Sequence, residues 1–210
     1  MSVLSVQPPT IPRSPASITA GHGWPDIHDP HMHTFLRCWA QWRQPAPRFG
    51  PVDAPTGKLP PRRRDIDPIA LRHCLPHLWI FRLDPDLRNA RLTLAGEEIL
   101  FYWGRGIIGL DLKELWGDEA KARVSLESLV RCAATPAIIH GRPQNHAPKA
   151  YGLSIERLML PLMNDDGSPF GVIGYSLFRR DPEWTESVRP RPSDAMQAYP
   201  LAELPDLPPD

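Results

Sequence analysis

The residues best suited to metal chemistry lie in a short run from Asp26 to His33, which combines carboxylates with imidazoles. Both groups are common ligands of divalent metals. A structural interpretation competes with the metal site, because Asp29 followed by Pro30 is typical of a helix start. His31 and His33 would then lie two residues apart on the helix and would not share a face. The run therefore favours a capped helix, and no metal site is expected.

Three glycines, Gly104, Gly106 and Gly109, match the G-x-G-x-x-G spacing that holds a dinucleotide pyrophosphate. That motif requires a strand before it and a long helix after it. The preceding residues, Glu97 to Trp103, have helical apolar spacing, and Gly117 interrupts the residues that follow. We interpret the glycines as helix ends that adopt positive φ.

Two further groups suggest chemistry less strongly. Arg62 to Arg64 could hold a phosphate or a cyclic dinucleotide, but Asp65 and Asp67 follow at once and offset most of the charge. Cys132 lies on a predicted helix rich in alanine and valine, where an inert buried thiol is expected. The chain has no G-x-S-x-G, H-E-x-x-H or P-loop lysine motif. These patterns favour a protein that is not an enzyme.

Length and charge limit the remaining classes. The chain has 210 residues, enough for one domain with a core of ordinary size. Lysine and arginine together number 24, as do aspartate and glutamate, so no net field favours nucleic acid or an anionic membrane. No apolar run approaches the roughly 20 residues of a membrane helix. The cysteine count, 3, is odd and fits no disulfide framework, so we expect reduced thiols and a cytoplasmic location.

Apolar residues at helical spacing predict an amphipathic helix over residues 30–44. Its aromatic face has two interpretations: it covers the domain's own sheet, or it contacts a second subunit. Because exposed aromatic surface favours aggregation, we expect a homodimer through this face. The expected interface residues are Phe35, Leu36, Trp39 and Trp42.

Alternating apolar residues predict a hairpin of strands over 77–84 and 90–96. A long amphipathic helix is expected over 118–135, followed by strands at about 137–143, 153–163 and 170–179. Asp166-Gly167 provides the turn between the last two strands, since Asp-Gly suits the positive φ of a tight hairpin.

Three stretches together resemble the PAS domain family, in particular its short stand-alone bacterial members. They are the L-P-x-R-R-x-D-I-D-P entry at residues 59–68, the strand-helix-glycine stretch from Leu94 to Trp116, and the ending P-L-M-N-D-D-G-S-P-F-G-V-I-G. The resemblance implies an α+β fold with a five-stranded antiparallel sheet, helices on one face and the added N-terminal helix. We expect a loosely packed arm over 1–29, the domain over 30–181 and a flexible Pro-rich tail over 182–210.

The resemblance also implies a function. Members of the family sense small ligands or mediate protein contacts, so we expect a regulatory protein that binds a ligand between the sheet and the long helix and signals to an unidentified protein partner. The alternative is a pure interaction module without a ligand. Haem-binding relatives place an axial histidine on the long helix, which has none at 118–135, and the flavin motif Asn-Cys-Arg-Phe is missing. Neither cofactor is expected.

Strand alternation leaves two candidate faces for the pocket, and the resemblance selects one. The expected lining residues are Phe81, Leu83, Leu126, Leu129, Arg157, Met159, Gly174 and Ser176. A buried guanidinium needs a partner, so a ligand that pairs with Arg157 would carry a carboxylate or phosphate on an apolar body. Alternatively, a bulge shifts the register and Arg157 pairs with an acidic neighbour in solvent.

Overall fold

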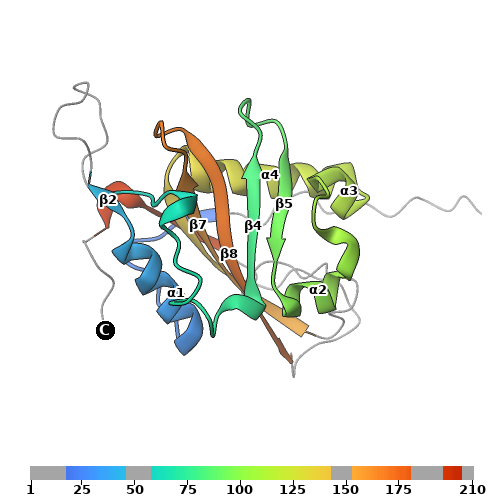
Figure 1. Ribbon diagram of the computed structural model, residues 1–210, viewed down its shortest axis with the longest axis horizontal. Helices are drawn as coiled ribbons and strands as arrows, with labels where there is room; N and C mark the ends of the chain where they lie inside the picture. Colours follow the sequence, from blue (N-terminus) through green and yellow to red (C-terminus); the bar gives the residue numbers. More distant parts are fainter. Residues whose placement is uncertain (1–17, 46–57, 143–152, 181–195, 205–210) are drawn as a thin grey trace, which may run out of the picture.

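A seven-stranded sheet organises the molecule, with strands in the order β1-β9-β6-β7-β8-β4-β5 (Figure 1). The computed structural model describes residues 18–45, 58–142, 153–180 and 196–204. Neighbouring strands are antiparallel except β1 and β9, which are parallel. The expected α+β class is therefore confirmed.

Five strands follow the predicted order along the chain. They are β4 (Leu78–Leu83), β5 (Ala90–Ala95), β6 (Ala137–Gly141), β7 (Leu153–Met163) and β8 (Pro169–Arg180). The turn between β7 and β8 forms at the predicted dipeptide, where Gly167 has φ 84° and the Asp166 carboxylate accepts the backbone N–H of Ser168 at 2.9 Å. This hairpin pairs the two longest strands, which lie in the middle of the sheet.

The other two strands differ from the prediction for the ends of the chain. β1 (Ile18–Ala20) lies within the expected arm over 1–29, and β9 (Met196–Pro200) lies within the expected flexible tail over 182–210. β9 pairs with the edge of β6, and its residues Met196, Ala198 and Tyr199 are buried. These apolar side chains explain why the segment joins the sheet in spite of its Pro-rich surroundings. Residues 1–17, 181–195 and 205–210 lie outside the described residues.

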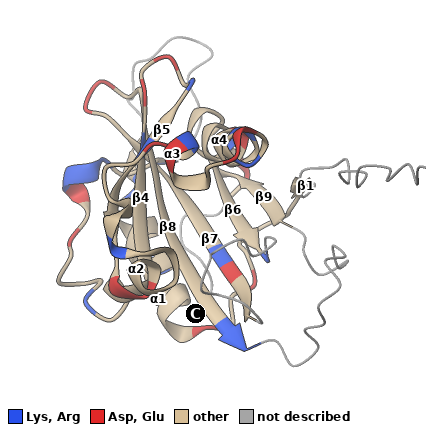
Figure 2. Ribbon diagram, turned by 90° about the vertical axis from the view of Figure 1, so that its right-hand side faces the viewer, with Lys and Arg blue, Asp and Glu red and all other residues tan. Residues whose placement is uncertain are grey.

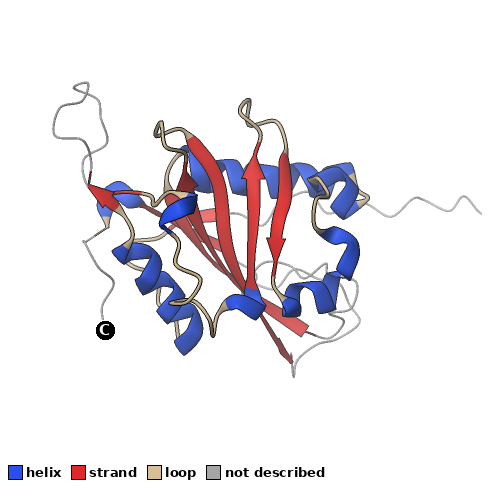
Figure 3. Ribbon diagram, viewed as in Figure 1, coloured by secondary structure: helices blue, strands red, loops and turns tan. Residues whose placement is uncertain are grey.

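Three helices cover one face of the sheet, which we call the inner face. They are α2 (Glu97–Trp103), α3 (Leu112–Trp116) and α4 (Glu119–Ala134), and α4 passes behind the strands in Figure 3. Asp118 caps α4, because its carboxylate accepts the backbone N–H groups of Ala120 and Lys121 at 2.9 and 3.1 Å. Gly117, with φ 58°, ends α3 and turns the chain into α4.

The outer face carries α1 (Pro30–Gln41), which ends before the predicted limit of residue 44. Asp29 accepts the backbone N–H groups of His31 and Met32 at 3.1 and 2.8 Å, so the predicted cap with proline at the first position is present. Beyond α1, the chain forms the short pair β2 (Gln44–Pro45) and β3 (Lys58–Leu59). Residues 46–57 of the expected irregular connection lie outside the described residues.

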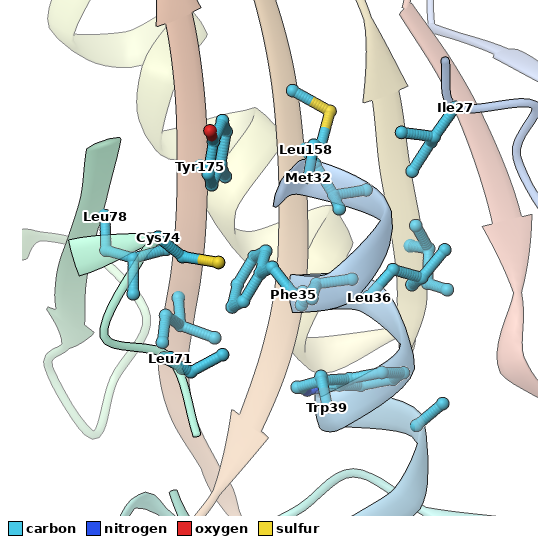
Figure 4. Close-up of a cluster of buried hydrophobic side chains, with 14 of the residues drawn as sticks. Ile27, Met32, Phe35, Leu36, Trp39, Leu71, Cys74, Leu78, Leu158 and Tyr175 are labelled. Atoms are coloured by element: carbon cyan, nitrogen blue, oxygen red, sulfur yellow. The ribbon is translucent and has the colours of Figure 1, made fainter. Parts of the chain in front are cut away.

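The aromatic face of α1 packs against the protein's own sheet (Figure 4). Phe35, Leu36 and Trp39 are 0% exposed within the single chain, and Trp42 is half-buried. Trp39 Nε1 donates to the carbonyl of Pro161 on β7 at 3.0 Å. The structure therefore favours the first of the two interpretations, in which this face covers the protein's own sheet. A homodimer through Phe35, Leu36, Trp39 and Trp42 stays a prediction, and it is disfavoured by the burial of the first three residues within one chain. Sequence periodicity identified the face but could not report what it packs on.

The described charges are spread over many elements (Figure 2). Blue and red segments are scattered over turns, helices and strands in Figure 2, and most of the ion pairs are exposed, as between Arg123 and Glu127 on α4. Such pairs contribute little stability. The apolar clusters on the two faces of the sheet therefore hold the fold together.

Candidate functional site

Three polar side chains meet on the inner face within an otherwise apolar layer. Ser176 Oγ accepts a hydrogen bond from Trp79 Nε1 at 2.9 Å and another from Arg157 Nε at 3.2 Å. The guanidinium carbon of Arg157 lies 5.9 Å from the centroid of the Trp79 ring, within cation–π range. Ser176 is only 2% exposed. One buried hydroxyl therefore joins an indole and a guanidinium.

Strand register brings this trio together. Trp79 on β4 pairs with Gly174 on β8, and Arg157 on β7 pairs with Ser176 on β8. Alternation along β8 places Gly174 and Ser176 on the same face. A Cβ at Gly174 would lie 2.0 Å from Trp79 Cζ2, so the missing side chain lets the indole lie flat against β8. Glycine at this position is what allows Trp79 to reach Ser176.

The structure places all eight predicted site residues on the inner face or on the helix that covers it. Leu83, Leu129 and Met159 are buried there, and Phe81 and Leu126 pack against them in half-buried positions. Gly174 was predicted to line the ligand pocket, but the indole of Trp79 covers it, and its role is to make room for that ring. The eight residues are Phe81, Leu83, Leu126, Leu129, Arg157, Met159, Gly174 and Ser176.

The alternative prediction for Arg157 does not describe the structure. The irregularity between β7 and β8 falls at Leu162 and Met163, and the pairing is regular through Arg157 and Ser176. A second irregularity lies between Ile80 and Phe81, where β4 meets β5. Neither turns Arg157 toward the outer face. Burial lowers the pKa of the Arg157 guanidinium to about 10, which still leaves it protonated at neutral pH.

Sequence reasoning missed several aromatic members of this region. Trp79 precedes Phe81 by two residues and shares its alternation, so the same periodicity could have found it. Tyr102 on α2 packs on Phe178 of β8 in a tilted arrangement, with ring centroids 4.0 Å apart. Trp103 and Trp116 meet edge to face at 4.8 Å. The first contact joins a helix to a distant strand and the second joins α2 to α3, and no local pattern signals either.

The other sequence candidates take structural roles. Arg62 and Arg64 both lie near Asp165 in the β7–β8 turn, at 3.6 and 3.0 Å, and Asp65 instead accepts from the backbone N–H of Arg62 at 2.9 Å. The arginine run therefore pairs with the turn between β7 and β8 and not with the acidic residues that follow it.

The glycine motif and the cysteine are also structural. Gly104 and Gly109 have φ of 109° and 93°, as predicted. The prediction is wrong for Gly106, which lies inside the 3-10 turn Arg105–Ile107 and does not adopt positive φ. Cys132 Sγ lies 3.2 Å from the carbonyl of Ala137, and burial raises the pKa of this thiol well above its usual value. A thiol held protonated in this way is a poor nucleophile.

The structure is a mixed α+β fold, with helices packed over the inner face of a mainly antiparallel sheet. This is the architecture that the resemblance to PAS domains implied. A family model described as PAS domain matches residues 31–177, and the chain belongs to that family. PAS domains are sensory or regulatory modules, and the protein is one of this general kind.

Among solved structures, the chain is similar to the PAS domain of BvgS from Bordetella pertussis. The two share 17% sequence identity with a TM-score of 0.37, over 54% of this chain and 84% of the BvgS domain. No curated protein matches the chain. Within the described ranges, no helix has the length and apolar character needed to cross a membrane.

Proposed function

We propose that this PAS protein is a non-catalytic, cytoplasmic sensor that holds a small ligand between the inner face of the sheet and α4. The observation that carries the proposal is the Trp79–Ser176–Arg157 cluster. Small-molecule sites are mostly apolar and contain a few convergent polar groups that orient the ligand. A serine and an arginine beside an indole, in a layer otherwise built from aliphatic, sulfur-containing and aromatic residues, have that composition.

Native mass spectrometry of protein purified from its own host tests the proposal. We expect a species heavier than the chain by the mass of one small organic molecule, and we expect that mass to be lost on denaturation. Protein refolded from denaturant is the control and should show the bare chain. A native preparation that contains only the bare chain would contradict the ligand sensor.

A second candidate function, the pure interaction module, is favoured by exposed apolar side chains beside the inner face. Phe101 on α2 is 63% exposed, and Ile108 in the turn that follows is 50% exposed. Large apolar side chains left in solvent are typical of surfaces that bind another protein. In the sensor they would serve as the output surface, toward a signalling partner or a second copy of the chain.

Light scattering of the wild type and of a Phe101→Ser, Ile108→Ser double variant tests this surface. If the two residues mediate a homodimer, the wild type is dimeric and the variant monomeric at the same concentration. Ile69→Ser is the matched control, since Ile69 is 74% exposed on the segment between Asp67 and Leu75. If the double variant stays dimeric, as the Ile69→Ser control should, Phe101 and Ile108 do not form the dimer contact.

A further inference from the structure

The side chains around Arg157 provide little to compensate its charge. On the inner face of β7 it is flanked by Ile155 and Met159, both buried. Across the sheet it pairs with Ser176 on β8 and with Gly141 on β6, which has no side chain. Ser176 is therefore the only polar side chain directly opposite Arg157 in this row of the sheet.

No carboxylate within the described parts of the chain lies within 4.0 Å of the Arg157 guanidinium. Glu156 is its neighbour in sequence, but alternation places that side chain on the outer face, where it pairs with His140 at 3.0 Å. A cation among apolar side chains without an ionic partner is costly. A ligand that carries the missing negative charge would offset this cost.

The hydrogen bonds of Arg157 leave one end of the guanidinium available. A guanidinium has five N–H donors, and the one on Nε is directed to Ser176 Oγ. The two Nη atoms have no hydrogen-bond acceptor among the described residues. They are also not fully buried, since the fully buried side-chain nitrogen and oxygen atoms without a partner do not include them. Both therefore keep some contact with the surface. A pair of parallel N–H groups at this end matches the two oxygens of a carboxylate or a phosphate.

Two further features describe what the rest of such a ligand would contact. Ser176 Oγ already accepts two hydrogen bonds, so its own hydrogen is left to donate toward an anionic oxygen. Phe178 follows two residues later on the same face of β8, and its ring packs against that of Tyr102 on α2. A charged group at Arg157 would therefore have apolar and aromatic side chains on both sides, from Met159 to Phe178.

We propose that the inner-face site selects an amphipathic anion, with a carboxylate or a phosphate monoester bound by the two Nη groups of Arg157 and an apolar body that lies against Met159 and Phe178. This inference rests on the proposed ligand-binding function and names the ligand class. The energetic source of selectivity is the bidentate ion pair that the half-buried guanidinium would gain, since its contacts with Ser176 and the Trp79 ring supply no opposite charge.

Calorimetric titration with three probes of equal chain length tests the class: octanoate, octyl phosphate and octan-1-ol. The probes share one apolar body and differ in the head group. We expect the two anions to bind ligand-free wild type at least about tenfold more tightly than the alcohol, as for one charged hydrogen-bonded pair. The comparison of octanoate with octyl phosphate distinguishes a carboxylate site from a phosphate site.

Arg157→Met removes the guanidinium and keeps an apolar stem of similar length, and a buried ion replaced by an apolar side chain usually leaves the fold intact. We expect it to bind all three probes equally. Arg157→Lys should keep part of the preference for anions, because it retains the positive charge and loses the two parallel N–H donors of the guanidinium. The matched control is Arg82→Met, since Arg82 lies 5.9 Å from the Phe170 ring in the same kind of cation–π contact but is exposed.

The outcomes separate this inference from the function on which it rests. Equal binding of the alcohol and the anions to wild type would overturn the anion selectivity and leave the ligand site standing. A preference for anions that persists in Arg157→Met would also overturn it, because another group would then supply the charge. If none of the three probes binds the wild type, the inference fails, and native mass spectrometry decides the proposed function independently.

Discussion

The indole N–H of Trp79 and the hydroxyl of Ser176 form a hydrogen bond of 2.9 Å between β4 and β8 under the helices of the inner face. The same hydroxyl accepts from Arg157 on β7 at 3.2 Å, so one oxygen fixes two large side chains from the strands on either side of it. The orientation of the guanidinium therefore depends on Ser176 and on the indole beside it.

Ser176→Ala should destabilise the protein by about 1–3 kcal/mol, because it leaves the buried N–H groups of Trp79 and Arg157 without their acceptor. Urea denaturation measures the change. The matched control is Ser128→Ala on α4, whose hydroxyl donates to the Val124 carbonyl of its own helix at 3.0 Å. That variant should stay within about 0.5 kcal/mol of the wild type. Equal effects of the two substitutions would show that Ser176 orients nothing.

Gly174→Ala should displace the Trp79 indole, since the added Cβ would lie 2.0 Å from Cζ2 of that ring. We expect a loss of roughly 1–3 kcal/mol, the usual cost of overpacking a core. The substitution should cost much less in a Trp79→Leu background, which a double-mutant cycle measures. Gly106→Ala is the control, because a Cβ there would meet nothing within 4 Å. Additive effects of Gly174→Ala and Trp79→Leu would contradict the packing argument.

Trp39→Ala should cost about 3–5 kcal/mol, because it removes a fully buried ring and the donor to the Pro161 carbonyl. Trp42→Ala removes a half-buried ring from the same helix and should cost less. Both losses should be independent of protein concentration in chemical denaturation, since the face of α1 packs within one chain. A loss that grows on dilution would point to burial between subunits.

The His140–Glu156 pair predicts a specific dependence of stability on acid. The hydrogen bond from His140 and the nearby charges lower the pKa of Glu156 below its usual value of 4.5. A carboxyl with a depressed folded-state pKa adds stability above its unfolded-state pKa and loses it as the pH falls through the folded value. Glu156→Gln should therefore flatten the fall in unfolding free energy below about pH 4.5.

Urea midpoints measured from neutral pH to acid provide this comparison. Glu97→Gln on α2 serves as the matched control, because it removes an exposed carboxyl and keeps the rest of the chain. Its acid dependence should follow the wild type. A Glu156→Gln variant with the same acid slope as the wild type would show that the pair does not stabilise the folded state.

The sequence allowed the central fold to be predicted because its signals are local. β4 and β5 carry alternating apolar residues, α4 carries an amphipathic pattern, and Asp29, Asp118 and Gly167 occupy caps and turns that favour those residue types. β1 and β9 could not be predicted this way. The first has three residues and the second five, both among prolines, and their strand structure comes from pairing with distant partners.

In the candidate site too, some features have a local sequence signal and others depend on residues far apart in the chain. Alternation left two candidate faces, the resemblance selected one of them, and in the structure Arg157, Ser176 and Met159 lie on the same face of the sheet. The contact that orients them comes from Trp79, and it depends on Gly174 lying opposite Trp79 across two strands nearly a hundred residues apart. The packing of α1 on its own sheet was likewise beyond the periodicity of the helix, because a helix face carries no information about its partner.

The indole N–H resonance of Trp79 tests the central claim most directly, since that N–H donates to Ser176 beside Arg157. The resonance is assigned by its loss in Trp79→Phe and is recorded for protein purified from its own host, before and after denaturation, solvent extraction and refolding. A ligand on the inner face predicts that the resonance shifts on extraction and returns when the extract is added back. An identical Trp79 resonance in all three samples would contradict a ligand at this site.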